Sequence, residues 1–452
     1  MSLIKRRDFL KSSLAAPMVV AGLGPSLSFA QDPYSENIFV FVFQRGGIDG
    51  LSFLTPMDGH PDRGFYEALR SNGTMIPSVQ LEALSGGWGL HPAAAPLKDL
   101  WNLNNLAIVQ AVGLPWANRS HFEAERYVEL GTPGNRFTPT GWLTRHMQTA
   151  INIPPEVLMP AIMTETTVRY SFLREPSAVT MRYPSNFDFD TGSSFYEEEQ
   201  ESALEQMYGV ENGELDIAGS QALAAMSLIE TIDFSGYIPD NGAVYPARLN
   251  DPTRLTSFGE ELKIIAQLIK EGTGVRLAQS DIGGWDTHNA QGNEGPDGDY
   301  FDNVRDLSES INAFFKDLDM PAPGGGSWAD RTTMIVYSEF GRRVFDNADA
   351  GTDHGWGNNC LAIGGGVNGG KFYGDWLGLH DDFLFQGADV WATTDFRSVF
   401  SEMLLRRLHN NKLGDIFPGF TAEQYKPLGI FSGAALQPDF NDPDVIFRDS
   451  AE

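Results

Sequence analysis

NIFVFVF, residues 37–43, is apolar at every position after Asn37 and stops at Gln44-Arg45-Gly46-Gly47. A strand buried on both faces shows no polar alternation, so this run predicts a central strand of a mainly parallel sheet. Similar runs, some of them with polar residues, recur at residues 106–112, 275–280, 332–337 and 360–363. Helical patterns lie between them, at residues 121–130, 258–271, 301–318 and 395–408. The alternation predicts an α/β fold, a mainly parallel central sheet flanked by helices.

The segment 185–255 interrupts this alternation. It contains an acidic run at residues 197–201, a pattern of small residues typical of a helix near 219–229, and turns rich in Pro and Gly. An acidic run by itself usually marks a solvated helix face. We therefore predict one α/β domain over residues 31–452, with a helical insertion or cap at about 185–255.

The first thirty residues have the pattern of an export signal. KRRDFLK, residues 5–11, precedes an apolar stretch over residues 12–29, and small residues at 28 and 30 suit cleavage before Gln31. The arginine pair followed by Phe-Leu-Lys predicts a twin-arginine signal peptide over residues 1–30, the alternatives being an ordinary secretory signal or a basic tail. Glycines and prolines make the stretch a poor membrane span, so we expect no stable membrane insertion. The expected partner during export is the twin-arginine translocase, and the expected location is periplasmic or secreted.

Charge and cysteine content narrow the possible partners. The chain of 452 residues has 32 Lys and Arg against 60 Asp and Glu, a formal net charge of −28. Such a surface repels nucleic acid and anionic lipid, so we expect neither as a partner. A single cysteine, Cys360, excludes an intramolecular disulfide and a thiolate zinc cluster.

Polar residues gather where the predicted strands end. They are Asp49 after the first run; Ser120 and His121, which open the helix after the second; Asp286 and His288; Glu339 and Arg342; and, just before the last run, Asp353 and His354. Sites in open α/β sheets form at the carboxyl ends of strands. Carboxylates together with imidazoles suit zinc, manganese or iron better than calcium. Each residue alone has a structural alternative: a turn or cap for the Asp, a hydrogen-bonded side chain for the His.

Ser120 stands where a helix begins, and the free N–H groups there favour an anion such as a phosphate or sulfate ester. A serine hydroxyl needs a base or a metal to become a good nucleophile. Arg45, Arg119 and Arg342 are candidates to clamp the anion in bidentate fashion. An ordinary N-cap remains the alternative for Ser120.

Five motifs together resemble a known family: FQRGGIDGL (43–51), NRSHF (118–122), GWDTH (284–288), SEFGR (338–342) and GTDHGWG (351–357). They look like the exported, uncharacterised family called domain of unknown function 1501, over about residues 37–410. That family is similar in outline to the alkaline phosphatase and sulfatase superfamily, in which a Ser or Thr nucleophile opens a helix beside one or two metals.

The resemblance implies roles for particular residues. Ser120 would be the nucleophile, and Asp49 would hold the metal beside it. Asp286, His288 and His354 would hold a second metal, while Glu339 stands directly after a strand where the superfamily has an Asp-His pair. We accordingly predict Ser120, His121 and Arg342 as catalytic residues. The predicted metal ligands are Asp49, Asp286, His288, Glu339, Asp353 and His354.

Two functions follow as expectations. The first is an exported metal-dependent hydrolase of phosphate or sulfate esters, with one or two divalent ions, zinc or manganese. Its substrate would be a small anionic ester or a sulfated or phosphorylated glycan. The alternative is a noncatalytic exported binding protein that keeps the superfamily fold and a metal.

Overall fold

A computed structural model describes residues 37–71, 73–154, 157–184, 187, 195–208, 213–292 and 298–441 of the chain. The predicted signal peptide, residues 1–30, lies outside the described residues. Within them the main sheet has the strand order β13-β5-β12-β11-β1-β10-β6-β7, and a short β16 also pairs with β5. The strands are β1 (Ile38–Gln44), β5 (Leu106–Gly113), β6 (Ala161–Met163), β7 (Ala178–Thr180), β10 (Leu277–Ile282), β11 (Thr332–Ser338), β12 (Asn358–Gly364), β13 (Lys371–Tyr373) and β16 (Thr394–Asp395).

The predicted central strand is β1. It pairs in parallel with β10 on one side and β11 on the other, and Val42 lies opposite Ser280 and Val336. Every residue of β1 is buried. Alternate side chains enter two different cores, Val40 and Val42 on one face and Phe39, Phe41 and Phe43 on the other. Two cores explain why the run is apolar without interruption.

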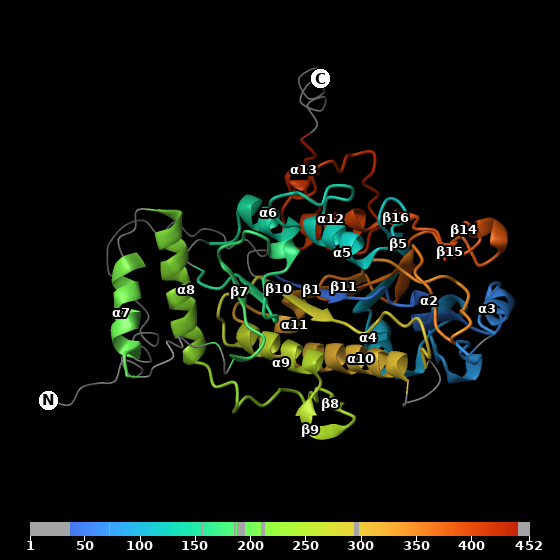
Figure 1. Ribbon diagram of the computed structural model, residues 1–452, viewed down its shortest axis with the longest axis horizontal. Helices are drawn as coiled ribbons and strands as arrows, with labels where there is room; N and C mark the ends of the chain where they lie inside the picture. Colours follow the sequence, from blue (N-terminus) through green and yellow to red (C-terminus); the bar gives the residue numbers. More distant parts are fainter. Residues whose placement is uncertain are drawn as a thin grey trace, which may run out of the picture.

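Helices cover both faces of the sheet, as Figure 1 shows. The Val40 face is covered by α4 (Ala95–Asn102), α9 (Ser257–Lys270) and α10 (Asp299–Leu318). The Phe41 face is covered by α5 (His121–Leu130), α6 (Trp142–Thr149) and α12 (Phe396–Arg406). The prediction of a mainly parallel sheet flanked by helices is therefore confirmed.

One strand of the main sheet runs against the others. β12 pairs antiparallel with both β11 and β5, whereas the pairs β1–β10, β1–β11, β10–β6 and β13–β5 are parallel. The loop that precedes β12 therefore lies at the same edge of the sheet as the loops that follow β1, β10 and β11. Had β12 been parallel, residues 351–357 would lie at the opposite edge.

The segment predicted as an insertion contains two helices, α7 (Glu197–Tyr208) and α8 (Glu214–Glu230), and a hairpin of β8 (Ala247–Arg248) and β9 (Asp251–Leu255). The two helices contact each other, and in Figure 1 they lie beyond β7. The acidic run at 197–201 begins α7, and the helix expected near 219–229 lies within α8. Parts of 185–255 lie outside the described residues.

The remaining α-helices and β-strands are short. They are α2 (Gly50–Phe53), α3 (Arg63–Leu69), α11 (Trp328–Arg331), α13 (Leu413–Ile416), β2 (Leu54–Pro56), β3 (Glu82–Ala83), β4 (Trp88–Leu90), β14 (Leu384–Phe385) and β15 (Asp389–Val390). Among the helices that the structure describes, none has both the length and the apolar character needed to cross a membrane.

Candidate metal centre

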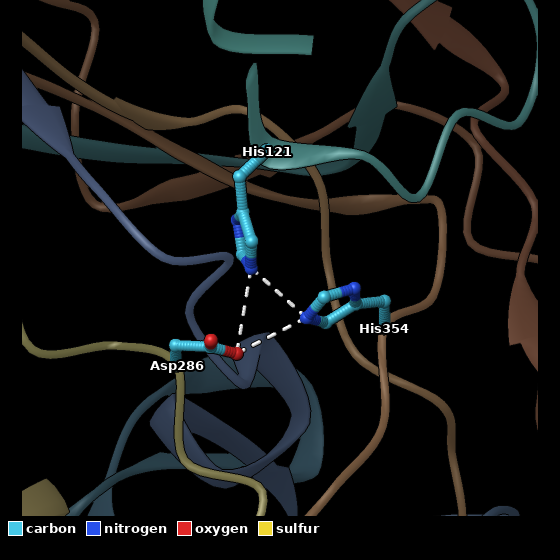
Figure 2. Close-up of side chains that lie close together, drawn as sticks. All are labelled: His121, Asp286 and His354. Atoms are coloured by element: carbon cyan, nitrogen blue, oxygen red, sulfur yellow. Dashed lines mark hydrogen bonds and ion pairs between the residues drawn. The ribbon is translucent and has the colours of Figure 1, made fainter. Parts of the chain in front are cut away.

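Three side chains from distant parts of the chain meet at the carboxyl edge of the sheet. His121 is the first residue of α5, Asp286 lies in the loop after β10, and His354 lies in the loop before β12. Figure 2 shows their polar tips pointing toward one another. His288, two residues after Asp286, joins them. The predicted ligands Asp286, His288 and His354 are thus brought together with His121, which was predicted to be catalytic.

The atoms that face one another are the Nε2 atoms of the three histidines and Oδ1 of Asp286. His354 Nε2 lies 2.9 Å from Nε2 of His121 and 2.9 Å from Nε2 of His288. Asp286 Oδ1 lies 3.0 Å from His354 Nε2, 3.0 Å from His288 Nε2 and 3.4 Å from His121 Nε2. Zinc bonds of about 2.0–2.1 Å in a tetrahedron separate two ligand atoms by about 3.3 Å. The three separations among His121, Asp286 and His354 suit a common ion, and His288 contacts two of these residues.

The other ring nitrogen of each histidine has an acceptor. His354 Nδ1 lies 2.9 Å from the backbone oxygen of Arg119, which can only accept, so the ring proton is on Nδ1. In the other two rings Nδ1 faces a carboxylate. Glu339 lies 2.7 Å from His121 Nδ1, and Asp353 lies 3.0 Å from His288 Nδ1. Acceptors on Nδ1 are the usual partners of metal-binding histidines, because they fix the tautomer and the ring.

This pattern of donors fits a divalent cation. With the protons on Nδ1, the Nε2 lone pairs of the histidines face Asp286 Oδ1, which also accepts from Arg342 Nη2 at 2.7 Å. One extra proton could bridge only one pair of these atoms. Burial lowers the pKa of His354, despite its contact with Asp286, and so favours a neutral ring. Burial also acts to lower the pKa of His121, but the hydrogen bond and charge of Glu339 outweigh it and raise that pKa. Imidazole with carboxylate is a donor set typical of zinc.

Glu339 and Asp353, both predicted as ligands, lie behind the histidines. Glu339 is fully buried, and its Oε1 also accepts the N–H of Gly46 at 2.9 Å, while Oε2 accepts from Ser338 Oγ at 3.0 Å. Both of its oxygens are therefore engaged with donors. Asp353 Oδ1 also accepts from Asn347 Nδ2 at 3.2 Å. We interpret both carboxylates as anchors that orient histidine rings.

Close backbone approach and ring packing hold the site together. Gly46 and Gly47 follow β1 with φ of +117° and +64°. A Cβ at Gly46 would lie 2.6 Å from the backbone nitrogen of Asp286, and one at Gly47 would lie 2.5 Å from the Phe340 ring. That buried ring in turn packs against His121 with centroids 4.8 Å apart. The glycines therefore allow three loops to meet around the histidines.

Asp49, the other predicted ligand, is not brought to this cluster. It is buried and faces Arg70, with Oδ2 2.5 Å from Nη1 and Oδ1 2.9 Å from Nη2. It also accepts from Gln291 Nε2 at 2.8 Å and caps α2 through Ser52. Burial raises the pKa of Asp49, but the charge and hydrogen bonds of Arg70 outweigh it and lower the pKa to about 2.

The arginines expected to clamp an anion are all engaged. Arg342 is buried, donates to the backbone oxygens of Gly47 at 2.6 Å and Thr352 at 2.8 Å, and pairs with Asp286 Oδ1 at 2.7 Å. It joins the loops that carry the metal-ligand candidates, which is a positioning role. Arg119 pairs with the buried Asp389.

Arg45 likewise lies among carboxylates. It contacts Asp281 at 2.5 Å, Glu125 at 2.9 Å and Glu129 at 2.9 Å. The two glutamates lie on α5, so Arg45 ties that helix to the strand ends beneath it.

Ser120 is the N-cap residue of α5, but its side chain does not cap the helix. Its own N–H donates to Asn118 Oδ1 at 2.9 Å. The residues on either side, Arg119 through its carbonyl and His121 through its ring, both contact His354. Ser120 is therefore fixed in the segment of chain that borders the histidine cluster.

Some of the residues around the site were not predicted from sequence. Glu125 lies one helical turn after His121 and, with Glu339, forms a second group of close potential ligands around that histidine. Burial of Glu125, together with the negative charge of Glu339, raises the pKa of Glu125 to about 7. The His-x-x-x-Glu spacing on a helix was the available signal. Arg70 gave no comparable signal, because its partner Asp49 is distant in sequence.

Comparison with known proteins bears on part of the chain. Residues 241–400 match the model of a family described as a protein of unknown function (DUF1501). The matched range contains Asp286, His288 and His354 but not His121. No curated protein matches the chain. The resemblance to that family is therefore supported over residues 241–400, and the description of the family names no activity.

Proposed function

We propose that this protein is an exported, metal-dependent hydrolase of phosphate or sulfate esters. Its ion, zinc or manganese, would be held by His121, Asp286 and His354, with His288 as a further ligand. The single observation that carries the proposal is the convergence of Nε2 lone pairs and a carboxylate oxygen at 2.9–3.4 Å, each ring held from behind by an acceptor. The further proposal of an alkaline phosphatase-like ancestry rests on the five strand-end motifs.

A bound divalent ion supplies positive charge that polarises an ester oxygen and lowers the pKa of a nearby hydroxyl or water. The chain's own residues would arrange the reaction around it. Ser120, whose hydroxyl is not used as a helix cap, is the candidate nucleophile. Its place before α5 puts helix N–H groups beside it, and these favour an anionic group. Arg342 would keep Asp286 and the loop after β1 in place.

A second candidate function is a noncatalytic metal-binding protein. The observation that favours it is the engagement of Arg45, Arg119 and Arg342 with carboxylates and carbonyls. Hydrolases of anionic esters generally use positive groups to stabilise the transition state. In a binding protein the metal would have a structural or storage role, and Ser120 would be dispensable.

Two variants separate these functions. Ser120→Ala should retain metal and fold yet lose ester hydrolysis by several orders of magnitude, because a nucleophile and its activator act as a unit. His354→Ala should lose both metal and hydrolysis. The matched control is Ser327→Ala, which removes a serine that does cap a helix, α11, and should cost only about 1 kcal/mol of stability.

The measurements are metal content by mass spectrometry and hydrolysis of a panel of aryl phosphates and sulfates. Hydrolysis that is unaffected by Ser120→Ala would remove Ser120 from the mechanism. Stoichiometric metal with no hydrolysis of any ester would favour the binding protein.

A further inference from the structure

A small cavity lies against Arg342, inside the protein. The twelve residues that line it are all buried or half-buried, and Leu51, Leu54 and Trp88 supply much of its apolar wall. The centre of a water molecule has about 20 Å³ in which to move there, and one water molecule needs about 10–15 Å³. The cavity therefore suits one water molecule rather than a larger ligand.

A β-bulge directs two residues of β5 toward this cavity. In the pairing of β5 with β12, Gln110 and Ala111 together lie opposite the single residue Asn359. Ala111 has a φ of +56°, which is uncommon for a residue other than glycine. Gln110 and Ala111 both line the cavity, whereas consecutive residues of a regular strand point to opposite faces of the sheet. The bulge therefore places the polar side chain of Gln110 at the cavity wall.

The cavity wall carries an amide donor and an amide acceptor that the described protein leaves unpaired. Gln110 is only 4% exposed, and its Nε2 has no hydrogen-bond partner among the described residues. Asn359 Nδ2 donates to the backbone oxygen of Gly50 at 2.8 Å, but no described residue donates to Asn359 Oδ1. Burying an amide without a partner costs free energy, so most buried polar groups bond to protein or to an ordered water. A water molecule can satisfy both groups, because it donates and accepts.

We propose that this cavity binds one ordered water molecule, which accepts from Gln110 Nε2 and donates to Asn359 Oδ1. The water bridges β5 and β12 at the point where the bulge interrupts their pairing. The adjacent Asn358 donates from Nδ2 to the backbone oxygens of Ile48 at 3.1 Å and Phe340 at 2.9 Å. The bridge thus lies where β12 meets the loops that follow β1 and β11. This inference does not depend on the proposed hydrolase function.

A high-resolution crystal structure of the mature protein tests the inference directly. It should show electron density for a water molecule about 2.7–3.2 Å from Gln110 Nε2 and about 2.5–3.0 Å from Asn359 Oδ1. A cavity with no density at that position would overturn the inference. The same result would leave the hydrolase proposal untouched, because the metal ligands lie outside the cavity wall.

Gln110→Met tests the bridge in solution, because methionine is unbranched, of similar length and apolar. Loss of the hydrogen bond to water should lower the melting temperature by about 1–2 °C and remove one long-lived water in magnetic relaxation dispersion of the solvent.

The matched control is Gln267→Met. Gln267 is equally buried, but its Nε2 donates to the backbone oxygen of Asp233 at 3.1 Å. This variant should also lower the melting temperature, yet keep the number of long-lived waters. A higher melting temperature in Gln110→Met with an unchanged number of waters would overturn the inference, because removing an unpaired buried donor relieves its desolvation penalty.

Discussion

Glu339→Gln tests whether the buried carboxylate behind His121 orients the metal site. The native side chain accepts from His121 Nδ1 at 2.7 Å, from Gly46 N–H at 2.9 Å and from Ser338 Oγ at 3.0 Å. Glutamine keeps one oxygen that accepts from His121 and Gly46, but it loses the charge and places an NH₂ group against Ser338. Removing a second-sphere partner of a metal-bound histidine typically weakens metal affinity by about 10- to 100-fold.

We expect Glu339→Gln to weaken zinc affinity about tenfold, or about 1.4 kcal/mol, at the lower end of that range. Glu339→Ala should reach about a hundredfold, and it should also lose about 1–3 kcal/mol of stability because buried donors are left unpaired. The assay is competition for zinc against a chromophoric chelator, with urea unfolding of the same samples in the absence of metal.

Glu402 provides the matched control. It is equally buried and accepts the backbone N–H groups of Leu428 at 2.8 Å and Gly429 at 2.9 Å, but it lies on α12 away from the histidines. Glu402→Gln should lower stability with no change in zinc affinity. Equal zinc affinity in wild type and Glu339→Gln, or the same loss in Glu402→Gln, would refute the anchoring role.

Three further predictions follow from particular residues. Replacing both Arg6 and Arg7 by Lys should retain precursor in the cytoplasm, because a receptor that reads guanidinium geometry does not accept ammonium; normal export in cell fractionation would contradict the twin-arginine interpretation. Asp49→Asn leaves Arg70 buried without its charge partner, so it should lower the free energy of unfolding by about 3–5 kcal/mol while the metal content stays unchanged. Loss of metal at unchanged stability would show instead that Asp49 is a ligand. Burial raises the pKa of Glu261 from 4.5 to about 8, although the hydrogen bond from Ser280 acts to lower it. Between these two pH values the folded state keeps a proton that the unfolded state has lost, so the free energy of unfolding should fall as pH rises. Glu261→Gln should flatten that slope in urea unfolding at several pH values, and an unchanged slope would show that another group titrates.

The fold could be predicted from sequence because both faces of the sheet are buried, which makes its central strands continuously apolar. The run at 37–43 predicted β1, and the pattern at 121–130 predicted α5 with its observed bounds. The direction of β12 was not readable, because an apolar run has the same composition in either direction. Yet that direction brings His354 to the edge where His121 and Asp286 lie.

The candidate site was only partly readable. Strand ends gather polar side chains at one edge, but it was the resemblance in motifs that implied Asp286, His288 and His354 as ligands of one metal. A carboxylate can bind the metal, orient a histidine ring or pair with an arginine. Which of these it does depends on the side chain that its oxygens contact. Glu339 meets His121 Nδ1, and Asp49 meets Arg70, across sequence separations that no local pattern encodes.

The central claim is that the histidine cluster binds one divalent ion. A crystal structure of the mature protein prepared with zinc, with diffraction recorded on both sides of the zinc absorption edge, tests it most directly. The account predicts an anomalous peak within about 2.0–2.1 Å of Nε2 of His121, Nε2 of His354 and Oδ1 of Asp286. A map with no anomalous peak there, with the rings bridged only by protons or by Arg342, would contradict it.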